Sequence, residues 1–241
     1  MSKERPILFS APMVRALLDG SKLQTRRVIK TTQPEWVRVN PNSHPDTDGR
    51  QCYGWDGNIG QAMRCPYGHP GDRLWVREAW MPDPPCDGTW GYTEWAGNRI
   101  GQIAAVPERF QLPAFCNYHA SWPHGSHDLR WTPSIHMPRW ASRITLEVTG
   151  VRVERLQDIS EADAVAEGIS RIPPPVADHG WSGPNRFTLR GMGKGLCAGH
   201  VNWNAPTAKA LYQRLWESIN GPESLEANPW VWVVEFKVVK P

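Results

Sequence analysis

The chain has 241 residues and a formal net charge of +3, with 27 Lys and Arg against 24 Asp and Glu. This length suffices for one large domain or two small ones, and the mild basic excess permits a nucleotide or nucleic-acid partner without requiring one. No apolar run approaches the length of a membrane-spanning helix, and residues 1–6 lack the apolar segment of a signal peptide. We therefore expect a cytoplasmic protein that does not associate with a membrane.

The chain is unusually rich in three residue types, with 14 Trp, 23 Pro and 21 Gly, which predicts short strands and long, ordered loops rather than a helical bundle. The five cysteines are an odd number without tight spacing and are typical of reduced thiols. The spacings of Cys65 with His69 and of Cys116 with His119 fall in the range of zinc sites. Because there is no CxxC pair and Cys52 and Cys86 stand alone, we expect no metal, with a zinc site at the two Cys–His pairs as the alternative. No cofactor is expected.

The N-terminal region combines a short apolar strand at residues 6–9 with a helix predicted over residues 12–18. Gly20 lies where this helix should end, because glycine enters the left-handed conformation without steric cost. The basic turn that follows becomes β-branched at residues 28–29, which indicates a strand edge. One interpretation is a solvent-exposed turn. The other is that the turn directs four polar side chains towards one site: Lys22, Thr25, Arg26 and Arg27.

The remaining chain alternates between loop-rich regions and regular elements. A strand is predicted around residues 74–79, and residues 144–156 alternate apolar with polar side chains, which indicates one bent strand or two strands broken near Gly150. Helices are expected at residues 158–169, with Ser160 as the N-cap, and at residues 207–219. Residues 230–239 are apolar on both faces and predict a central strand. Residues 31–63 are predicted to be mostly loop with one edge strand, and short strands are expected at residues 91–93 and 103–106.

A rigid polar loop at residues 133–140 precedes the longest strand and offers a second set of candidate ligand contacts. Guanidinium groups suit phosphate, and a histidine contacts phosphate or base. These candidates, together with the two arginines of the basic turn, are Arg26, Arg27, His136, Arg139 and Arg143. Trp140 is a candidate for stacking on a base. The alternatives are that Arg143 pairs with a neighbouring carboxylate and that Trp140 anchors the core or a loop.

Four motifs together resemble the ASCH domain, a relative of the PUA domain: GSKLQTRR at residues 20–27, PGDRLWVRE at 70–78, PSIHMPRWASR at 133–143 and NPWVW at 228–232. The similarity is strongest to the branch encoded by bacteriophages and prophages. The resemblance implies an α+β fold: a small twisted β-barrel with rim helices and a cleft between them. We expect a single PUA-like domain over residues 1–241, with Pro-, Gly- and Trp-rich insertions at about 31–62, 81–130 and 170–206.

The resemblance also implies chemistry. The superfamily is linked to RNA binding and nucleotide chemistry, and its small bacterial enzymes share the Gly-x-Lys-x-x-Thr turn. Those enzymes are amidohydrolases that remove the acetyl group from N4-acetylcytidine through a lysine, a threonine and a glutamate. By motif, these roles fall on Lys22, Thr25 and Glu167. This chain is longer than those enzymes and has Leu23 where they tend to have threonine.

The residue types are suited to cleaving an amide, which needs a base, a donor to the oxyanion and an acid for the leaving amine. A partly desolvated Lys22 can lose its proton near neutral pH, Thr25 can attack or orient water, and Glu167 can relay protons. The alternative is a structural ion pair beside a strand-capping threonine.

We expect a nucleoside or nucleic-acid partner, RNA rather than DNA. Two non-hydrolytic alternatives are a binding module for RNA, DNA or a modified base, and a scaffold for protein contacts; a third alternative is a metal-independent ribonuclease. The sequence does not indicate an oligomeric state.

Overall fold

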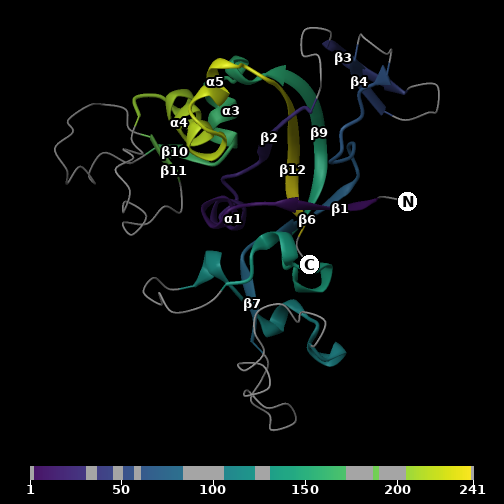
Figure 1. Ribbon diagram of the computed structural model, residues 1–241, viewed down its shortest axis with the longest axis vertical. Helices are drawn as coiled ribbons and strands as arrows, with labels where there is room; N and C mark the ends of the chain where they lie inside the picture. Colours follow the sequence, from purple (N-terminus) through teal and green to yellow (C-terminus); the bar gives the residue numbers. More distant parts are fainter. Residues whose placement is uncertain are drawn as a thin grey trace, which may run out of the picture.

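A five-stranded sheet forms the centre of the protein in the computed structural model (Figure 1). The model describes residues 3–30, 37–45, 51–56, 61–83, 106–122, 131–171, 187–189 and 205–239. The strand order is β1-β6-β9-β12-β2, in which β1 and β6 run parallel and the other neighbours are antiparallel. The strands are β1 (Glu4–Leu8), β6 (Arg73–Arg77), β9 (Thr145–Arg155), β12 (Trp230–Val239) and β2 (Gln24–Val28).

Strand β12 is central, as its sequence predicts. It pairs with β9 on one side and with β2 on the other. Its side chains alternate, because successive residues of a strand point to opposite faces: Val231 and Val233 pack in the core beneath the helices, whereas Trp232 and Val234 belong to the core on the other face. The predicted break at Gly150 is a change of register opposite Glu235 within one continuous strand, β9.

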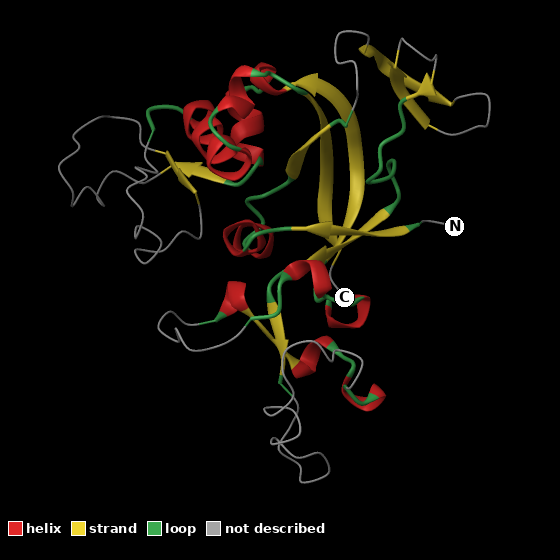
Figure 2. Cartoon of the chain, in the orientation of Figure 1, coloured by secondary structure: helices red, strands yellow, loops and turns green. Residues whose placement is uncertain are grey.

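Helices α3, α4 and α5 gather on one face of the sheet, whereas α1 contributes Val14 and Leu17 to the core on the other face, and the predicted α+β class is confirmed (Figure 2). Ser160 caps α3 by accepting a hydrogen bond from the Asp163 N–H, as predicted. Helix α3 is shorter than residues 158–169, since residues 156–158 form a 3₁₀ turn before it and a strand begins at Ile169. The helices are α1 (Ala11–Leu18), α3 (Glu161–Ala166), α4 (Ala208–Asn220) and α5 (Glu223–Glu226).

Smaller sheets lie within the regions predicted to be loop-rich. The described part of residues 31–62 is a three-stranded sheet rather than mostly loop, because Tyr53 packs edge-on against Trp232 at 5.6 Å and draws this segment onto the core. The strand expected at residues 91–93 lies outside the described residues, as does all of the strand expected at residues 103–106 except Val106, which forms a bend. The additional strands are β3 (Val37–Pro45), β4 (Gln51–Asp56), β5 (Gln61–Ala62), β7 (Trp80–Pro82), β8 (Cys116–Tyr118), β10 (Ile169–Arg171) and β11 (Phe187–Leu189).

No closed barrel is found among the described residues, contrary to the expectation. Strands β1 and β2 are the two edges of the sheet and do not pair with each other. Helix α1 forms the connection between them: it starts three residues after β1 ends and lies beyond the end of β1, next to the start of β2 (Figure 1). The Arg27 side chain, rather than a backbone ladder, reaches from β2 to the Leu8 carbonyl of β1.

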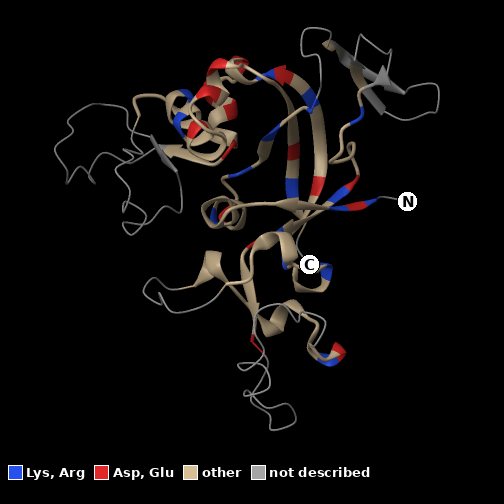
Figure 3. Ribbon diagram, viewed as in Figure 1, with Lys and Arg blue, Asp and Glu red and all other residues tan. Residues whose placement is uncertain are grey.

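The chemistry of the described surface is mixed. None of the described helices combines the length and the apolarity needed to cross a membrane. Acidic and basic residues are interspersed along β9, β12 and the helices instead of being segregated by sign (Figure 3). An extended groove for a nucleic-acid backbone requires clustered Lys and Arg, and no such cluster stands out on the described elements (Figure 3).

Asp72 joins the start of β1 to the start of β6. Its carboxylate accepts hydrogen bonds from the Lys3 backbone N–H at 3.0 Å and from the Arg5 guanidinium at 2.6 Å. Gly68 has a φ of +102°, and a Cβ at that position would come within 2.5 Å of the Asp72 carboxylate. Burial raises the pKa of Asp72, and the hydrogen bonds from Arg5 and Lys3 lower it. The lowering outweighs the effect of burial, so the pKa lies below its ordinary value.

Replacement of Asp72 by Asn should lower the free energy of unfolding by about 2 kcal/mol at neutral pH, since hydrogen bonds to a charged group are lost. A carboxylate with a depressed pKa stabilises the fold above its unfolded pKa of 3.8, and this stabilisation is lost as the pH falls through the folded pKa. Urea titrations of wild type and Asp72→Asn should therefore converge below pH 3.8. The exposed Asp158→Asn is the control, and a difference between wild type and Asp72→Asn that stays constant with pH would contradict this role.

Candidate functional site

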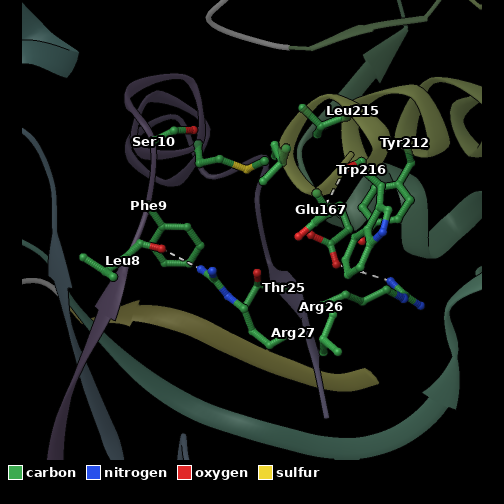
Figure 4. A pocket seen from close by; sticks show the side chains of 14 residues that line it. Leu8, Phe9, Ser10, Thr25, Arg26, Arg27, Glu167, Tyr212, Leu215 and Trp216 are labelled. Atoms are coloured by element: carbon green, nitrogen blue, oxygen red, sulfur yellow. Dashed lines mark hydrogen bonds and ion pairs between the residues drawn. The ribbon is translucent and has the colours of Figure 1, made fainter. Parts of the chain in front are cut away.

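A cavity of about 220 Å³ lies at the gap between the sheet edges (Figure 4). Its walls come from the end of β1 and the residues that follow it, from β2, from the end of α3 and from α4. The absence of β1–β2 pairing is thus what leaves room for this cavity. Glu161 helps to set its far wall, because its carboxylate accepts hydrogen bonds from the first N–H groups of α4 and holds that helix beside α3.

A buried ion pair lies behind the cavity. Lys22 Nζ donates hydrogen bonds to Glu167 Oε2 at 2.8 Å and to the Glu167 backbone carbonyl at 2.9 Å, and both residues are at most 2% exposed. The two residues also form an isolated antiparallel bridge. Gly168 permits this approach, since a Cβ there would lie 3.1 Å from the Ala16 side chain and 3.4 Å from Lys22 Cβ. Gly20, with a φ of +76°, turns the chain from α1 into this contact.

The pKa of Lys22 is lowered from its ordinary value. Burial is the largest cause, and the neighbouring charges of Arg27 and Arg26 act in the same direction. The Glu167 carboxylate opposes them and raises the pKa in part. A lysine in this setting gives up its proton more readily than a surface lysine does.

Arg26 is buried and its charge is compensated by carboxylates. Its guanidinium lies 3.3 Å from Glu167, 3.0 Å from Glu154 and 3.3 Å from Asp163. Arg152 extends this network by contacting Glu154 and Asp163. Arg26 therefore fastens α3 to β2 and β9 as well as lining the cavity.

Thr25 and Arg27 are two residues apart on β2, so their side chains leave the same face of the strand. The Thr25 hydroxyl points into the cavity (Figure 4) and has no hydrogen-bond partner within the described residues. Arg27 donates a hydrogen bond to the Leu8 carbonyl, and its guanidinium lies 5.3 Å from the centre of the Phe9 ring. A free hydroxyl, a carboxylate and a cation thus share one cavity.

The structure brings one group of the predicted residues together and leaves the other elsewhere. Thr25, Arg26, Arg27 and Glu167 line the cavity, with Lys22 behind Glu167. The second group does not line it, and its members lie in and after the 3₁₀ turns near β7 and β8 (Figure 1). That second group consists of His136, Arg139, Trp140 and Arg143.

The second group has structural partners of its own. Arg143 forms a two-pronged ion pair with the buried Glu78 at 2.9 and 3.0 Å, and burial raises the pKa of that glutamate despite the arginine. Trp140 packs edge-on against Trp80 with ring centres 5.3 Å apart. These contacts agree with the alternatives predicted from the sequence, in which Arg143 pairs with a carboxylate and Trp140 anchors the core or a loop. His136 is exposed.

Arg139 is also exposed and pairs with Glu4 at 2.9 Å, at the beginning of β1 and therefore at the opposite end of that strand from the cavity. Its side chain lies 6.0 Å from the Trp75 ring. Arg139 comes shortly before β9 in the sequence, but this proximity alone does not show which end of the sheet its side chain reaches. The prediction that it contacts ligand is not supported by its position relative to this cavity.

Three aromatic residues that the sequence analysis did not select line the cavity: Phe9, Tyr212 and Trp216. Tyr212 and Trp216 are four residues apart on α4, and their ring centres are 6.3 Å apart. The Arg26 guanidinium lies 5.9 Å from the Tyr212 ring. The only signal in the sequence was this i, i+4 aromatic spacing, which equally predicts an ordinary core helix.

The two Cys–His spacings do not converge into a ligand set. Among the described residues, no group of three or more His, Cys, Asp and Glu side chains is placed to hold a metal ion. Burial raises the pKa of Cys65 and of Cys116 to about 12 in each case. Both thiols are therefore protonated near neutral pH in the metal-free protein.

Replacement of Glu167 by Gln should destabilise the protein by about 3–5 kcal/mol, because it leaves Lys22 buried beside a neutral amide. Urea unfolding measures the effect. The matched control is Glu147→Gln, which removes the partner of the exposed Lys237 at 2.9 Å and should cost less than about 1 kcal/mol. Equal losses in the two variants would contradict the view that the Lys22–Glu167 contact holds the site together.

Searches with this chain against protein-family models, curated protein sequences and solved structures gave no match. The function is therefore inferred from the motifs and the geometry of the cavity.

Proposed function

We propose that the protein is a PUA-like ASCH protein that binds a modified nucleobase or nucleoside in this cavity and hydrolyses an acyl amide on it, as in N4-acetylcytidine. The observation that carries the proposal is the meeting of the free Thr25 hydroxyl and the Glu167 carboxylate at one cavity, with Lys22 hydrogen-bonded behind the carboxylate. These are the three roles that the ASCH-like motifs assign. A protein with this activity and with reduced thiols is expected to act in the cytoplasm.

The proposed reaction adds water across the amide bond. Glu167, coupled to Lys22, accepts the proton of the attacking hydroxyl group, which belongs to Thr25 or to a water that Thr25 orients. The oxygen forms a bond to the acyl carbon, and the carbon–nitrogen bond then breaks as the amine leaves with a proton returned by the Lys22–Glu167 pair. If Thr25 attacks, water releases the acyl group from it in a second step. The products are a carboxylic acid and the free exocyclic amine.

The size and the walls of the cavity support a small ligand. Its volume of about 220 Å³ lies below the roughly 300–1,000 Å³ of sites for drug-sized ligands, so it suits one ring-sized group with the remainder of the ligand outside. Phe9, Tyr212 and Trp216 supply flat aromatic surfaces for such a ring. A nucleoside, or one unstacked nucleotide of an RNA, fits these dimensions better than a paired stem.

A second candidate is a reader of modified bases that performs no chemistry. The observation in its favour is that Lys22 and Glu167 are already hydrogen-bonded to each other and deeply buried, as in a structural pair. Ribonuclease activity has less support, since His136, Arg139 and Arg143 do not join the cavity. Product formation separates the hydrolase from the reader.

Thr25→Val should lower kcat for deacetylation of N4-acetylcytidine by at least about 100-fold, because it removes a reacting or orienting hydroxyl and retains the shape of the side chain. Liquid chromatography with mass spectrometry measures the cytidine released. Since the hydroxyl has no partner within the described residues, the melting temperature should change little. Thr149→Val, on the exposed side of β9, is the control. Wild-type turnover by Thr25→Val would refute the hydrolase, and binding without any product from the wild type would favour the reader.

A further inference from the structure

The charges around the cavity are balanced with one exception. Lys22 is paired with Glu167, and Arg26 is surrounded by three carboxylates. Arg27 has no acidic partner within the described residues; it contacts the Leu8 carbonyl and the face of the Phe9 ring. Arg27 is therefore the cavity-lining cation whose charge this part of the protein leaves uncompensated.

The hydrogen-bonding capacity of Arg27 is also incompletely used. Its Nε atom is buried and has no acceptor among the described residues. Burying a polar donor without a partner is unfavourable, and the cost is larger for a charged group. Because the side chain lines the cavity, a ligand there can supply the missing negative charge and can accept hydrogen bonds from the terminal N–H groups of the guanidinium.

We propose that the ligand places an anionic group against Arg27, so that the preferred substrate class is an N-acylated nucleoside monophosphate rather than an uncharged nucleoside. The identity of the base rests on the proposed function. The anion-binding role of Arg27 rests on the cavity alone.

The layout of the cavity is compatible with a ligand of this shape. In Figure 4, Arg27 lies with Leu8 and Phe9 on one side of the cavity, and Tyr212 and Trp216 lie on the other, with Thr25 and Glu167 between them. A base beside the α4 rings and a phosphate beside Arg27 would thus bracket the reacting groups.

The cavity is also open near Arg27. Leu8, whose carbonyl accepts a hydrogen bond from Arg27, and Val28, the next residue in the chain, line it and are 40% and 44% exposed. A phosphate at Arg27 can therefore keep part of its hydration while it accepts hydrogen bonds from the guanidinium. The guanidinium fork matches phosphate oxygens in geometry.

A rival role for Arg27 is to stabilise the oxyanion that develops on the acyl carbonyl. That role would serve charged and uncharged substrates equally, and its loss would lower kcat for both. A role in binding a phosphate affects the charged ligand selectively and acts on affinity. The two roles are therefore separable by comparing ligands that differ only in the phosphate.

The test compares cytidine with cytidine 5′-monophosphate as ligands, using isothermal titration calorimetry on wild type, Arg27→Gln and Arg155→Gln. Arg155 is a matched control, because it also stacks on an aromatic ring, at 4.2 Å from the centre of Trp230, and donates to a backbone carbonyl, but it does not line the cavity. Wild type and Arg155→Gln should bind the monophosphate at least about tenfold more tightly than cytidine. Arg27→Gln should lose this preference and keep its affinity for cytidine.

Equal affinity of the wild type for the two ligands would overturn the inference, as would retention of the preference by Arg27→Gln. Binding of inorganic phosphate alone through Arg27, with cytidine adding no affinity, would overturn the nucleotide assignment.

Deacetylation assays on the same proteins keep the two proposals distinct. Turnover of N4-acetylcytidine without phosphate preference leaves the proposed function standing, whereas an Arg27-dependent phosphate preference without turnover leaves only this inference standing. If Arg27→Gln loses kcat equally on N4-acetylcytidine and on its 5′-monophosphate, the oxyanion role is supported and the phosphate-binding role of Arg27 is overturned.

Discussion

The contact between Lys22 and Glu167 joins the turn after α1 to the end of α3, two segments that are 145 residues apart in the chain. Removing both charges from water is costly, and the ion pair recovers that cost only through good geometry and additional hydrogen bonds. Here the additional bonds come from the Glu167 backbone carbonyl and from Arg26. Apolar residues of similar volume often stabilise a core equally well. A buried pair of this kind is therefore weak evidence for stability by itself, and its position next to the cavity is what the proposed function uses.

The open sheet and the cavity have the same origin. The two edge strands β1 and β2 do not pair, and the space between them is lined by side chains from the end of β1, from β2 and from α4. Each wall offers a different chemistry: the β2 side carries Thr25 and the cationic Arg27, and the α4 side carries Tyr212 and Trp216. The fold thus confines polar and aromatic groups in one small volume, which an isolated basic turn on the surface would not do.

Local signals predicted the local features well. Gly20 and Gly168 mark the ends of α1 and α3, and the apolar residues on both faces of β12 anticipate its central place. The turn at residues 20–27 contains three residues of β2 that line the cavity, Thr25, Arg26 and Arg27. Long-range packing was not predictable in the same way: Tyr53 brings a polar segment onto Trp232, and Arg143 turns to Glu78 instead of the cavity. The aromatic wall on α4 was missed because its spacing is also that of a core helix.

The central claim is that the cavity backed by the Lys22–Glu167 pair performs chemistry on a modified nucleoside. The most direct measurement is mass spectrometry of nucleoside mixtures and RNA digests after incubation with wild type and with Lys22→Met, a variant that removes the amine and retains an unbranched side chain one atom shorter. The account predicts that an acylated cytidine disappears and its deacylated form appears only with the wild type, while both proteins remain folded by circular dichroism. Identical traces from the two folded proteins would contradict it.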